Sequence, residues 1–152
     1  MDDCRTIENL LVRYMELVDA GELKAMSELF HNCTLCSPAD EQGVTGSAAV
    51  LETYLKSTRI YPETGTPRTK HVLTNIFIEV DEAGQTAVSR SQYTVFQGTE
   101  SLPFQPIVAG RYHDQFVRTD GGWEFHRRTI FVDFIGDLSA HLLTDIPKSS
   151  LS

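Results

Sequence analysis

The feature that most constrains the fold is a change in the spacing of apolar residues near position 69. Residues 5–19 carry apolar side chains three and four positions apart, which predicts an amphipathic helix. From residue 69 onward apolar and polar side chains alternate, which predicts strands. Helices that come first and strands that follow indicate an α+β fold rather than a fold in which the two alternate.

Three helices and two short strands are expected in the first part of the chain. The first helix covers residues 5–19, and a third helix opens at Gly46-Ser47. Short strands are expected at residues 33–37 and 42–45. The second helix is short and carries its apolar side chains at Leu23, Met26, Leu29 and Phe30.

Four long antiparallel strands are expected in the second part of the chain. Turn residues separate them at Asp81-Glu82-Ala83-Gly84 and at Asp120-Gly121-Gly122. Three helices can cover a single face of such a sheet only if the sheet is strongly curved. The predicted strands cover residues 71–80, 86–96, 108–118 and 123–134.

Length and charge restrict the class of protein. A chain of 152 residues fits one domain, expected at residues 1–146, with a disordered tail at residues 147–152. The formal net charge is −8 and there is no run of Lys or Arg, so nucleic acid is not an expected partner. No apolar stretch has the length of a membrane span, and no signal peptide is recognisable, so we expect a cytoplasmic protein.

The cysteines and most of the histidines suggest neither a disulfide framework nor a metal site. Three cysteines are an odd number, and Cys33-Thr34-Leu35-Cys36 lies in a predicted strand, where positions three apart face opposite ways. Four histidines have no recognised metal spacing, and we expect them on the surface or at an interface: His31, His113, His126 and His141. We therefore predict no metal and no cofactor.

Several stretches, taken in order, resemble the SnoaL-like branch of the NTF2-like superfamily. They are Arg13-Tyr14, Asp19-x-Gly21-Glu22-Leu23, Leu29-Phe30, Lys70-His71-Val72-Leu73-Thr74-Asn75, the hairpin from Gly110-Arg111-Tyr112 to Arg127-Arg128, and Gly136-Asp137-Leu138-Ser139-x-His141-Leu142. The resemblance spans nearly the whole chain. It implies a cone-shaped, cystatin-like roll that encloses one small-molecule pocket.

Within that superfamily the chain is similar to scytalone dehydratase and to hexachlorocyclohexane dehydrochlorinase. Both use an Asp–His pair in the pocket and both are trimers, so the resemblance implies a homotrimer, with a dimer as the alternative. Asp19 and His71 match the pair by position, and Arg128 matches a pocket arginine of the dehydrochlorinase. Tyr14 stands where the dehydrochlorinase has a lysine, and a neutral hydroxyl attracts a departing chloride less than an ammonium does.

The Asp19–His71 pair also has a chemical rationale of its own. A carboxylate bonded to one imidazole nitrogen fixes the tautomer and makes the other nitrogen more basic. His71 could then remove a proton from carbon or hydroxyl near neutral pH. The alternative is that Asp19 merely ends a helix and that His71 is a half-buried strand residue.

Four further residues are candidate contacts for a substrate. Strand alternation places Asn75 on the face of His71, where it either binds a substrate oxygen or bonds to neighbouring backbone. The resemblance favours Val108 and Tyr112 facing inward, whereas the hairpin turn alone leaves the face of that strand open. Tyr14 is either a pocket residue or a core tyrosine of the first helix.

Arg128 shares its face with Ile130 and Val132, so its guanidinium is expected against apolar side chains. An arginine in such a place either pairs with an acid or binds an anionic or carbonyl group of the substrate. Asp133 points to the other face, and Asp19 is therefore the acid that we consider as its partner.

These features favour a cofactor-independent lyase or isomerase. His71 would be the base, Asp19 its orienting acid, and the ligand a small, mostly apolar molecule with one or two oxygens. Dehydration is favoured over dehydrohalogenation because of Tyr14. The alternatives are a non-catalytic module, either a ligand binder or a β subunit of a ring-hydroxylating dioxygenase, and a polyketide cyclase, which would need a much wider pocket.

Overall fold

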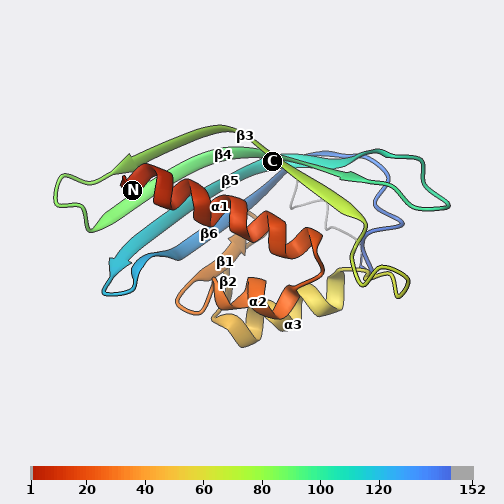
Figure 1. Ribbon diagram of the computed structural model, residues 1–152, viewed down its shortest axis with the longest axis horizontal. Helices are drawn as coiled ribbons and strands as arrows, with labels where there is room; N and C mark the ends of the chain where they lie inside the picture. Colours follow the sequence, from red (N-terminus) through yellow and green to blue (C-terminus); the bar gives the residue numbers. More distant parts are fainter. Residues whose placement is uncertain (1, 145–152) are drawn as a thin grey trace.

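A computed structural model describes residues 2–144 and confirms the α+β class (Figure 1). The helices precede the four long strands, as the spacing of apolar residues predicts. The elements, in chain order, are α1 (Asp3–Asp19), α2 (Leu23–Glu28), β1 (Thr34–Ser37), β2 (Asp40–Thr45), α3 (Ser47–Ser57), β3 (Thr69–Val80), β4 (Thr86–Gln97), β5 (Gln105–Thr119) and β6 (Gly122–Ile135).

The strands form one six-stranded sheet in the order β2-β1-β6-β5-β4-β3. The four long strands are antiparallel to their neighbours among themselves, as expected, but β1 pairs with β6 in parallel. The difference arises because the chain leaves β1, crosses through β2 and α3, and builds β3 to β6 before it returns to the free edge of β1. The sheet is mixed and curved (Figure 1).

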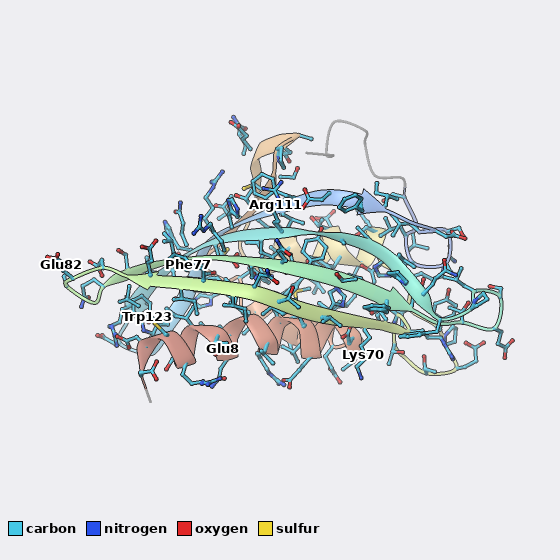
Figure 2. The ribbon with its side chains drawn as sticks, turned by 90° about the horizontal axis from the view of Figure 1, so that it is seen from above. Glu8, Lys70, Phe77, Glu82, Arg111 and Trp123 are labelled. Carbon is cyan, nitrogen blue, oxygen red and sulfur yellow. The ribbon has the colours of Figure 1, made fainter. Side chains whose placement is uncertain are left out.

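The helices cover one face of the sheet, which we call the inner face. From above, α1 lies along this side, whereas Phe77 and Arg111 lie on the opposite side (Figure 2). The inward residues of α1 include Ile7 and Leu11, which are completely buried. The apolar core therefore fills the space between the curved sheet and the helices.

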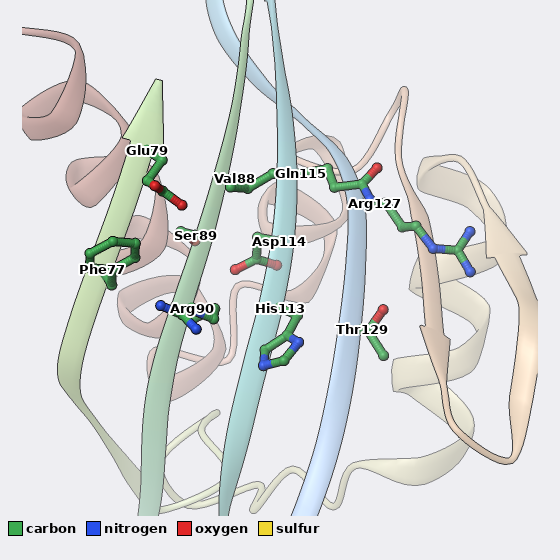
Figure 3. A pocket seen from close by; sticks show the side chains of 10 residues that line it. All are labelled: Phe77, Glu79, Val88, Ser89, Arg90, His113, Asp114, Gln115, Arg127 and Thr129. Carbon is green, nitrogen blue, oxygen red and sulfur yellow. The ribbon is translucent and has the colours of Figure 1, made fainter. Parts of the chain in front are cut away.

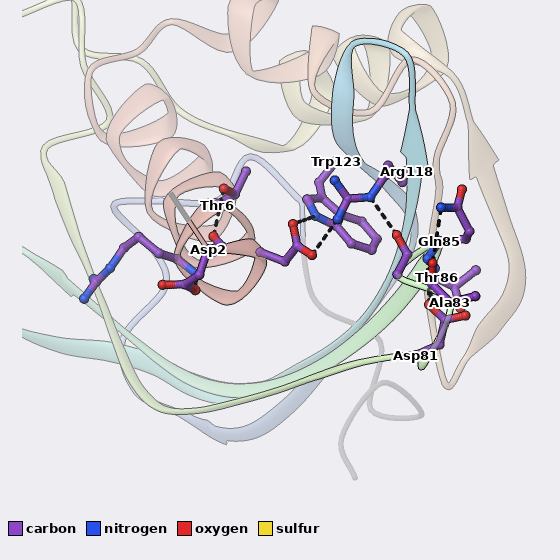
Figure 4. Close-up of polar contacts among 11 residues, drawn as sticks. Asp2, Thr6, Asp81, Ala83, Gln85, Thr86, Arg118 and Trp123 are labelled. Atoms are coloured by element: carbon purple, nitrogen blue, oxygen red, sulfur yellow. Dashed lines mark hydrogen bonds and ion pairs between the residues drawn. The ribbon is translucent and has the colours of Figure 1, made fainter.

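The start of α1 is fixed to the far end of the β5–β6 hairpin (Figure 4). The side chain of Asp2 caps the helix by accepting a hydrogen bond from the backbone N–H of Arg5. Asp3 accepts a hydrogen bond from Trp123 Nε1 at 3.0 Å and pairs with Arg118. With its first turn held there, α1 runs across the sheet and ends with Asp19 beside the beginning of β3.

A β-bulge in β3 overturns the predicted position of Asn75. The pairing with β4 shifts between Thr74 and Phe77, and Asn75 has a left-handed backbone with φ of 54°. The extra residue breaks the alternation. His71 and Leu73 therefore face inward, but Asn75 and Phe77 are exposed. Asn75 does not line the cavity described below, and its predicted place on the face of His71 is wrong.

A second bulge decides which residues of the β5–β6 hairpin face one another. Residues 120 and 121 form the turn, and the register then shifts at His126, because Phe116 pairs with Phe125 but Gln115 pairs with Arg127. Arg128 consequently lies directly opposite Asp114. Tyr112 shares this inward face, as the family resemblance implies.

The chain beyond β6 returns to α3. The N–H of Arg59 donates to the carbonyl of His141 at 2.8 Å, and the N–H of Leu143 donates to the carbonyl of Ser57 at 2.8 Å. The expected domain end at residue 146 and the tail at residues 147–152 lie outside the described residues. None of the helices between residues 2 and 144 has the length and apolar character needed to span a membrane.

Candidate functional site

The inner face of the sheet holds a cavity of about 250 Å³. Its walls come from α1, α3, β1, the four long strands and the segment after β6. The lining is mostly apolar and aromatic, with a few polar groups, which is the usual composition of a small-molecule site. The lining residues are Tyr14, Val18, Leu35, Thr53, Tyr54, Ser57, Thr58, His71, Tyr93, Val95, Val108, Tyr112, Ile130, Val132, Leu138, His141 and Leu142.

Asp19 and His71 meet at the wall of this cavity. His71 Nδ1 lies 2.5 Å from Asp19 Oδ1, and because a carboxylate only accepts, Nδ1 donates. The backbone N–H of His71 donates to Asp19 Oδ2 at 2.8 Å, and the hydroxyl of Thr69 donates to Oδ1 at 2.9 Å. Three donors thus hold the carboxylate, and the carboxylate holds the imidazole in one tautomer.

The electrostatics of the pair keep Asp19 ionised. Burial by itself would raise the pKa of Asp19, but the hydrogen bond and charge of His71 outweigh it, and the pKa is lowered. The side chain of His71 is only 7 % exposed. Its Nε2 makes no hydrogen bond within residues 2–144, and the ring lines the cavity. A basic nitrogen is therefore free on the cavity side.

Two tyrosine hydroxyls form a second polar feature. The hydroxyls of Tyr14 and Tyr54 lie 2.5 Å apart, one donating to the other. The ring of Tyr14 stands edge-on to that of His71, with centroids 6.4 Å apart. Since only one hydroxyl hydrogen is used between the two oxygens, the second remains for a ligand oxygen. Tyr14 is thus both a buried residue of α1 and a pocket residue.

Tyr112 and Val108 line the cavity from β5, as the family resemblance implies. Tyr112 stacks on Tyr93 with ring centroids 4.4 Å apart. The hydroxyl of Tyr93 donates to the carbonyl of Phe131 at 2.8 Å, which fixes this stack against β6. The two rings form a flat apolar wall rather than a source of protons, because burial raises the pKa of both hydroxyls.

Arg128 does not reach the cavity, and Asp19 is not its partner. Its Nε donates to Asp114 Oδ1 at 2.7 Å and its Nη2 to Oδ2 at 3.0 Å, and both side chains are completely buried. The guanidinium carbon lies 4.5 Å from the ring centre of Tyr14 and 4.0 Å from that of Tyr112. Arg128 therefore lies behind two rings of the cavity wall, and of the two predicted alternatives the acid pair is the one observed.

Burial by itself lowers the pKa of Arg128, but the charge and hydrogen bonds of Asp114 outweigh it and raise the pKa. The guanidinium therefore stays charged. Further contacts with the rings of Phe125 and Phe30, at 4.9 and 5.9 Å, complete an aromatic enclosure. Such contacts favour a cation in an apolar core.

Among the cavity residues that the sequence did not single out, three carry polar groups on aromatic rings: Tyr54, Tyr93 and His141. The alternation of β4 predicts that Tyr93 faces the same side as Val95, and that pattern could have identified it. Tyr54 lies in α3 and reaches the cavity from that helix. His141 was expected on the surface or at an interface, but only 9 % of its surface is exposed.

A separate groove of about 480 Å³ lies on the outer face of the sheet (Figure 3). The guanidinium of Arg90 lies over the ring of Phe77 there, 4.8 Å from its centre. None of the site residues predicted from sequence lines this groove. Over residues 2–144, no group of three or more His, Cys, Asp or Glu side chains is arranged to hold a metal ion.

The chain matches the family described as SnoaL-like domain over residues 1–129. Among curated proteins there is no match.

Solved structures with this fold include three from Novosphingobium aromaticivorans. An NTF2-like protein with a cystatin-like fold is 24% identical, with a TM-score of 0.66 over 86% of this chain and 81% of that one. A protein provisionally named scytalone dehydratase is 25% identical, with a TM-score of 0.69 over 88% and 86%. A protein provisionally named the β subunit of an aromatic-ring-hydroxylating dioxygenase is 17% identical, with a TM-score of 0.66 over 89% and 92%.

Proposed function

The chain belongs to the SnoaL-like domain family, and we propose that it is a cofactor-independent lyase or isomerase acting on a small, mostly apolar substrate. The observation that carries the proposal is the hydrogen bond from His71 Nδ1 to Asp19 at the wall of a cavity. This arrangement leaves Nε2 as the basic atom that faces the cavity. An imidazole oriented by a carboxylate is a common general base.

The reaction begins with transfer of a proton from a substrate carbon next to a carbonyl to Nε2 of His71. The C–H bonding pair moves into the carbonyl and forms an enolate. In a dehydration, the enolate then forms a carbon–carbon double bond as hydroxide leaves the neighbouring carbon, and this hydroxide takes the proton from Nε2 to become water. In an isomerisation, the proton returns to a different carbon. Asp19 stabilises the imidazolium that exists between the two steps.

The Tyr14–Tyr54 hydroxyl pair is suited to hold the substrate carbonyl. The hydroxyl that accepts the hydrogen bond from the other still has its own hydrogen to donate to the substrate. The bond that it accepts stabilises the negative charge that builds up on its oxygen as it donates. A donor aimed at a developing enolate oxygen lowers the barrier more than it strengthens ground-state binding. The pair thus supplies the electrophilic part of the site, opposite in role to His71.

The cavity size and lining support a neutral, ring-sized substrate. A cavity of roughly 150 Å³ lined by apolar side chains holds benzene, and this cavity measures about 250 Å³. Among residues 2–144, neither Lys nor Arg lines it. Because Tyr14 offers a hydroxyl and not an ammonium, dehydration is favoured over loss of chloride. A polyketide cyclase would need a wider space than this.

Solvent deuterium exchange tests the proposal without knowledge of the physiological substrate. The two-ring ketone 2-tetralone is incubated with protein in deuterated buffer, and exchange beside its carbonyl is followed by proton NMR above the background rate. We expect His71→Ala to lower the catalysed rate roughly a hundredfold or more. His31→Ala is the matched control, because this exposed histidine pairs with Glu124 away from the cavity. An unchanged rate in His71→Ala would remove His71 from the mechanism.

The main rival is a non-catalytic role, favoured by the likeness to the dioxygenase β subunit. A buried acid–imidazole pair beside a cavity supports the enzyme, whereas a pocket packed with side chains would have supported the structural role. Size-exclusion chromatography with and without a co-expressed large subunit separates the two. The same measurement tests the homotrimer that the family resemblance implies.

A further inference from the structure

His141 is a second imidazole at the cavity, and the mechanism above does not use it. It lies on the segment after β6, together with Leu138 and Leu142, which also line the cavity. The residue is 9 % exposed, and neither ring nitrogen has a hydrogen-bond partner within residues 2–144; Nδ1 is enclosed, so Nε2 is the nitrogen that keeps exposed surface at the cavity. A buried polar atom without a partner costs free energy, so it is uncommon unless another molecule satisfies it.

The backbone around His141 is fixed by several hydrogen bonds. The carbonyl of Ala140 accepts from the hydroxyl of Tyr61 at 2.5 Å and from Gln97 Nε2 at 3.0 Å. The N–H of His141 donates to Leu138 at 3.0 Å, and its carbonyl accepts from Arg59 at 2.8 Å. The imidazole is therefore held in the cavity wall by its own segment and is not a mobile surface group.

The environment of His141 also sets its charge. Burial and the neighbouring His71 lower the pKa of His141 to about 4, so the ring is neutral near pH 7. A neutral imidazole that is not readily protonated is a poor acid, but it is a good hydrogen-bonding group. It can donate to a carbonyl or accept from a hydroxyl, depending on its tautomer.

We infer that His141 is a ligand-binding residue that forms a hydrogen bond between Nε2 and an oxygen of a neutral, ring-sized ligand. The inference rests on the proposed function only in taking the cavity as the ligand site. His71 and His141 then approach the ligand from different elements, β3 and the segment after β6. His71 reacts with the ligand, whereas His141 selects for an oxygen on it.

Two probes of similar shape test this inference: 2-naphthol, which carries a hydroxyl, and naphthalene, which does not. Their affinities are measured by calorimetry or ligand fluorescence for wild type, His141→Phe and His141→Gln. Phenylalanine keeps the ring volume without a polar atom. Glutamine keeps a polar atom near the position of Nε2 but loses the ring. A purely structural role for His141 would favour Phe over Gln, and a binding role predicts the reverse.

We expect wild type to bind 2-naphthol more tightly than naphthalene. His141→Phe should weaken the binding of 2-naphthol roughly threefold to tenfold, as expected for one hydrogen bond, and leave naphthalene unchanged. His141→Gln should retain the binding of 2-naphthol within about twofold. No binding of 2-naphthol by wild type, no loss in His141→Phe, or an equal loss for both probes would overturn the inference.

A second measurement covers the case in which the Phe variant fails to fold. In wild type with nitrogen-15 histidine, 2-naphthol should shift the Nε2 resonance of His141, and an unshifted resonance at saturation would overturn the inference. Neither test needs catalysis, because 2-naphthol has no acidic C–H beside a carbonyl. If His71→Ala left deuterium exchange unchanged while His141 still selected for the hydroxyl, the proposed function would fail and the inference would stand.

Discussion

Two acid–base pairs lie on the inner side of the same sheet, and they differ in what they present to the cavity. Asp114 and Arg128 face each other across β5 and β6, share two hydrogen bonds and are completely buried. Asp19 and His71 join the end of α1 to the start of β3, and His71 lines the cavity. The first pair is enclosed by aromatic rings, and the second presents one basic nitrogen to a ligand.

The comparison shows that burial and charge do not by themselves indicate chemistry. The family resemblance implies a pocket position for both Arg128 and His71, but only His71 lies on the cavity. Arg128 supports the ring faces of Tyr14 and Tyr112 from behind. We therefore assign stability and cavity shape to the Asp114–Arg128 pair, and proton transfer to the Asp19–His71 pair.

The largest expected effect is on the enclosed pair. Asp114→Ala leaves the guanidinium of Arg128 charged and without its acid in the core, because the arginine keeps its proton. Removing one partner of a buried ion pair typically lowers the free energy of unfolding by about 3–5 kcal/mol. Urea denaturation checks this value.

A double variant is the matched control for that experiment. Asp114→Leu combined with Arg128→Met removes both charges together, and such replacements are often neutral or stabilising. We expect it to recover most of the lost stability and to retain deuterium exchange of 2-tetralone. Loss of exchange in a well-folded double variant would contradict the separation of the two pairs and would return Arg128 to the mechanism.

A smaller effect concerns the free energy of unfolding at acidic pH. As the pH falls, His141 at the cavity should lower this stability before the enclosed Asp114–Arg128 pair does. The pKa of His141 is lowered to about 4 from an ordinary value of 6.5. Between these values the unfolded chain binds a proton that the folded chain excludes. The stabilising contribution is therefore complete above pH 6.5 and is lost as pH falls toward 4, by roughly 2 kcal/mol between pH 7 and pH 5.

Thermal unfolding as a function of pH checks this expectation, with His141→Phe as the control. The variant should lose less stability than wild type between pH 7 and pH 5, because it has no imidazole to protonate on unfolding. The lowered pKa of Asp19 acts in the same direction, but only below about pH 4, where the unfolded carboxyl gains its proton. Parallel curves for the two proteins would show that His141 is not held neutral in the fold.

The smallest effect concerns Asn75, which the bulge places outside the cavity. Asn75→Val puts a branched side chain at φ of 54°, where such residues are strained, and should lower the free energy of unfolding by roughly 1–2 kcal/mol. Asn75→Gly should leave stability nearly unchanged, because glycine adopts this conformation readily. Both variants should exchange deuterium at the wild-type rate when folded. A fall in exchange would place Asn75 in the site after all.

The class of fold could be predicted from the spacing of apolar residues, and the central pair from the family resemblance, but the bulges could not be predicted. The change of apolar spacing near residue 69 predicted helices followed by strands, and the resemblance implied that Asp19 and His71 meet. Strand alternation failed at Asn75 and left the face of Val108 and Tyr112 open, because one inserted residue reverses the face of every residue after it. Nothing local in the sequence marks the extra residues in β3 and β6.

His141 was missed for a different reason. It follows the last strand, and whether such a segment covers a cavity depends on hydrogen bonds to Tyr61, Gln97 and Arg59, which are distant in sequence. The parallel pairing of β1 with β6 is likewise a consequence of tertiary assembly and not of local spacing.

The most direct test of the difference between the two pairs is a nitrogen-15 NMR titration with 2-naphthol. The side-chain resonances of His71 and Arg128 are assigned with His71→Ala and with the double variant of Asp114 and Arg128. Our account predicts that Nε2 of His71 shifts as 2-naphthol saturates the cavity, while Nε of Arg128 keeps its chemical shift. A ligand-dependent shift at Arg128 with an unmoved His71 would contradict it.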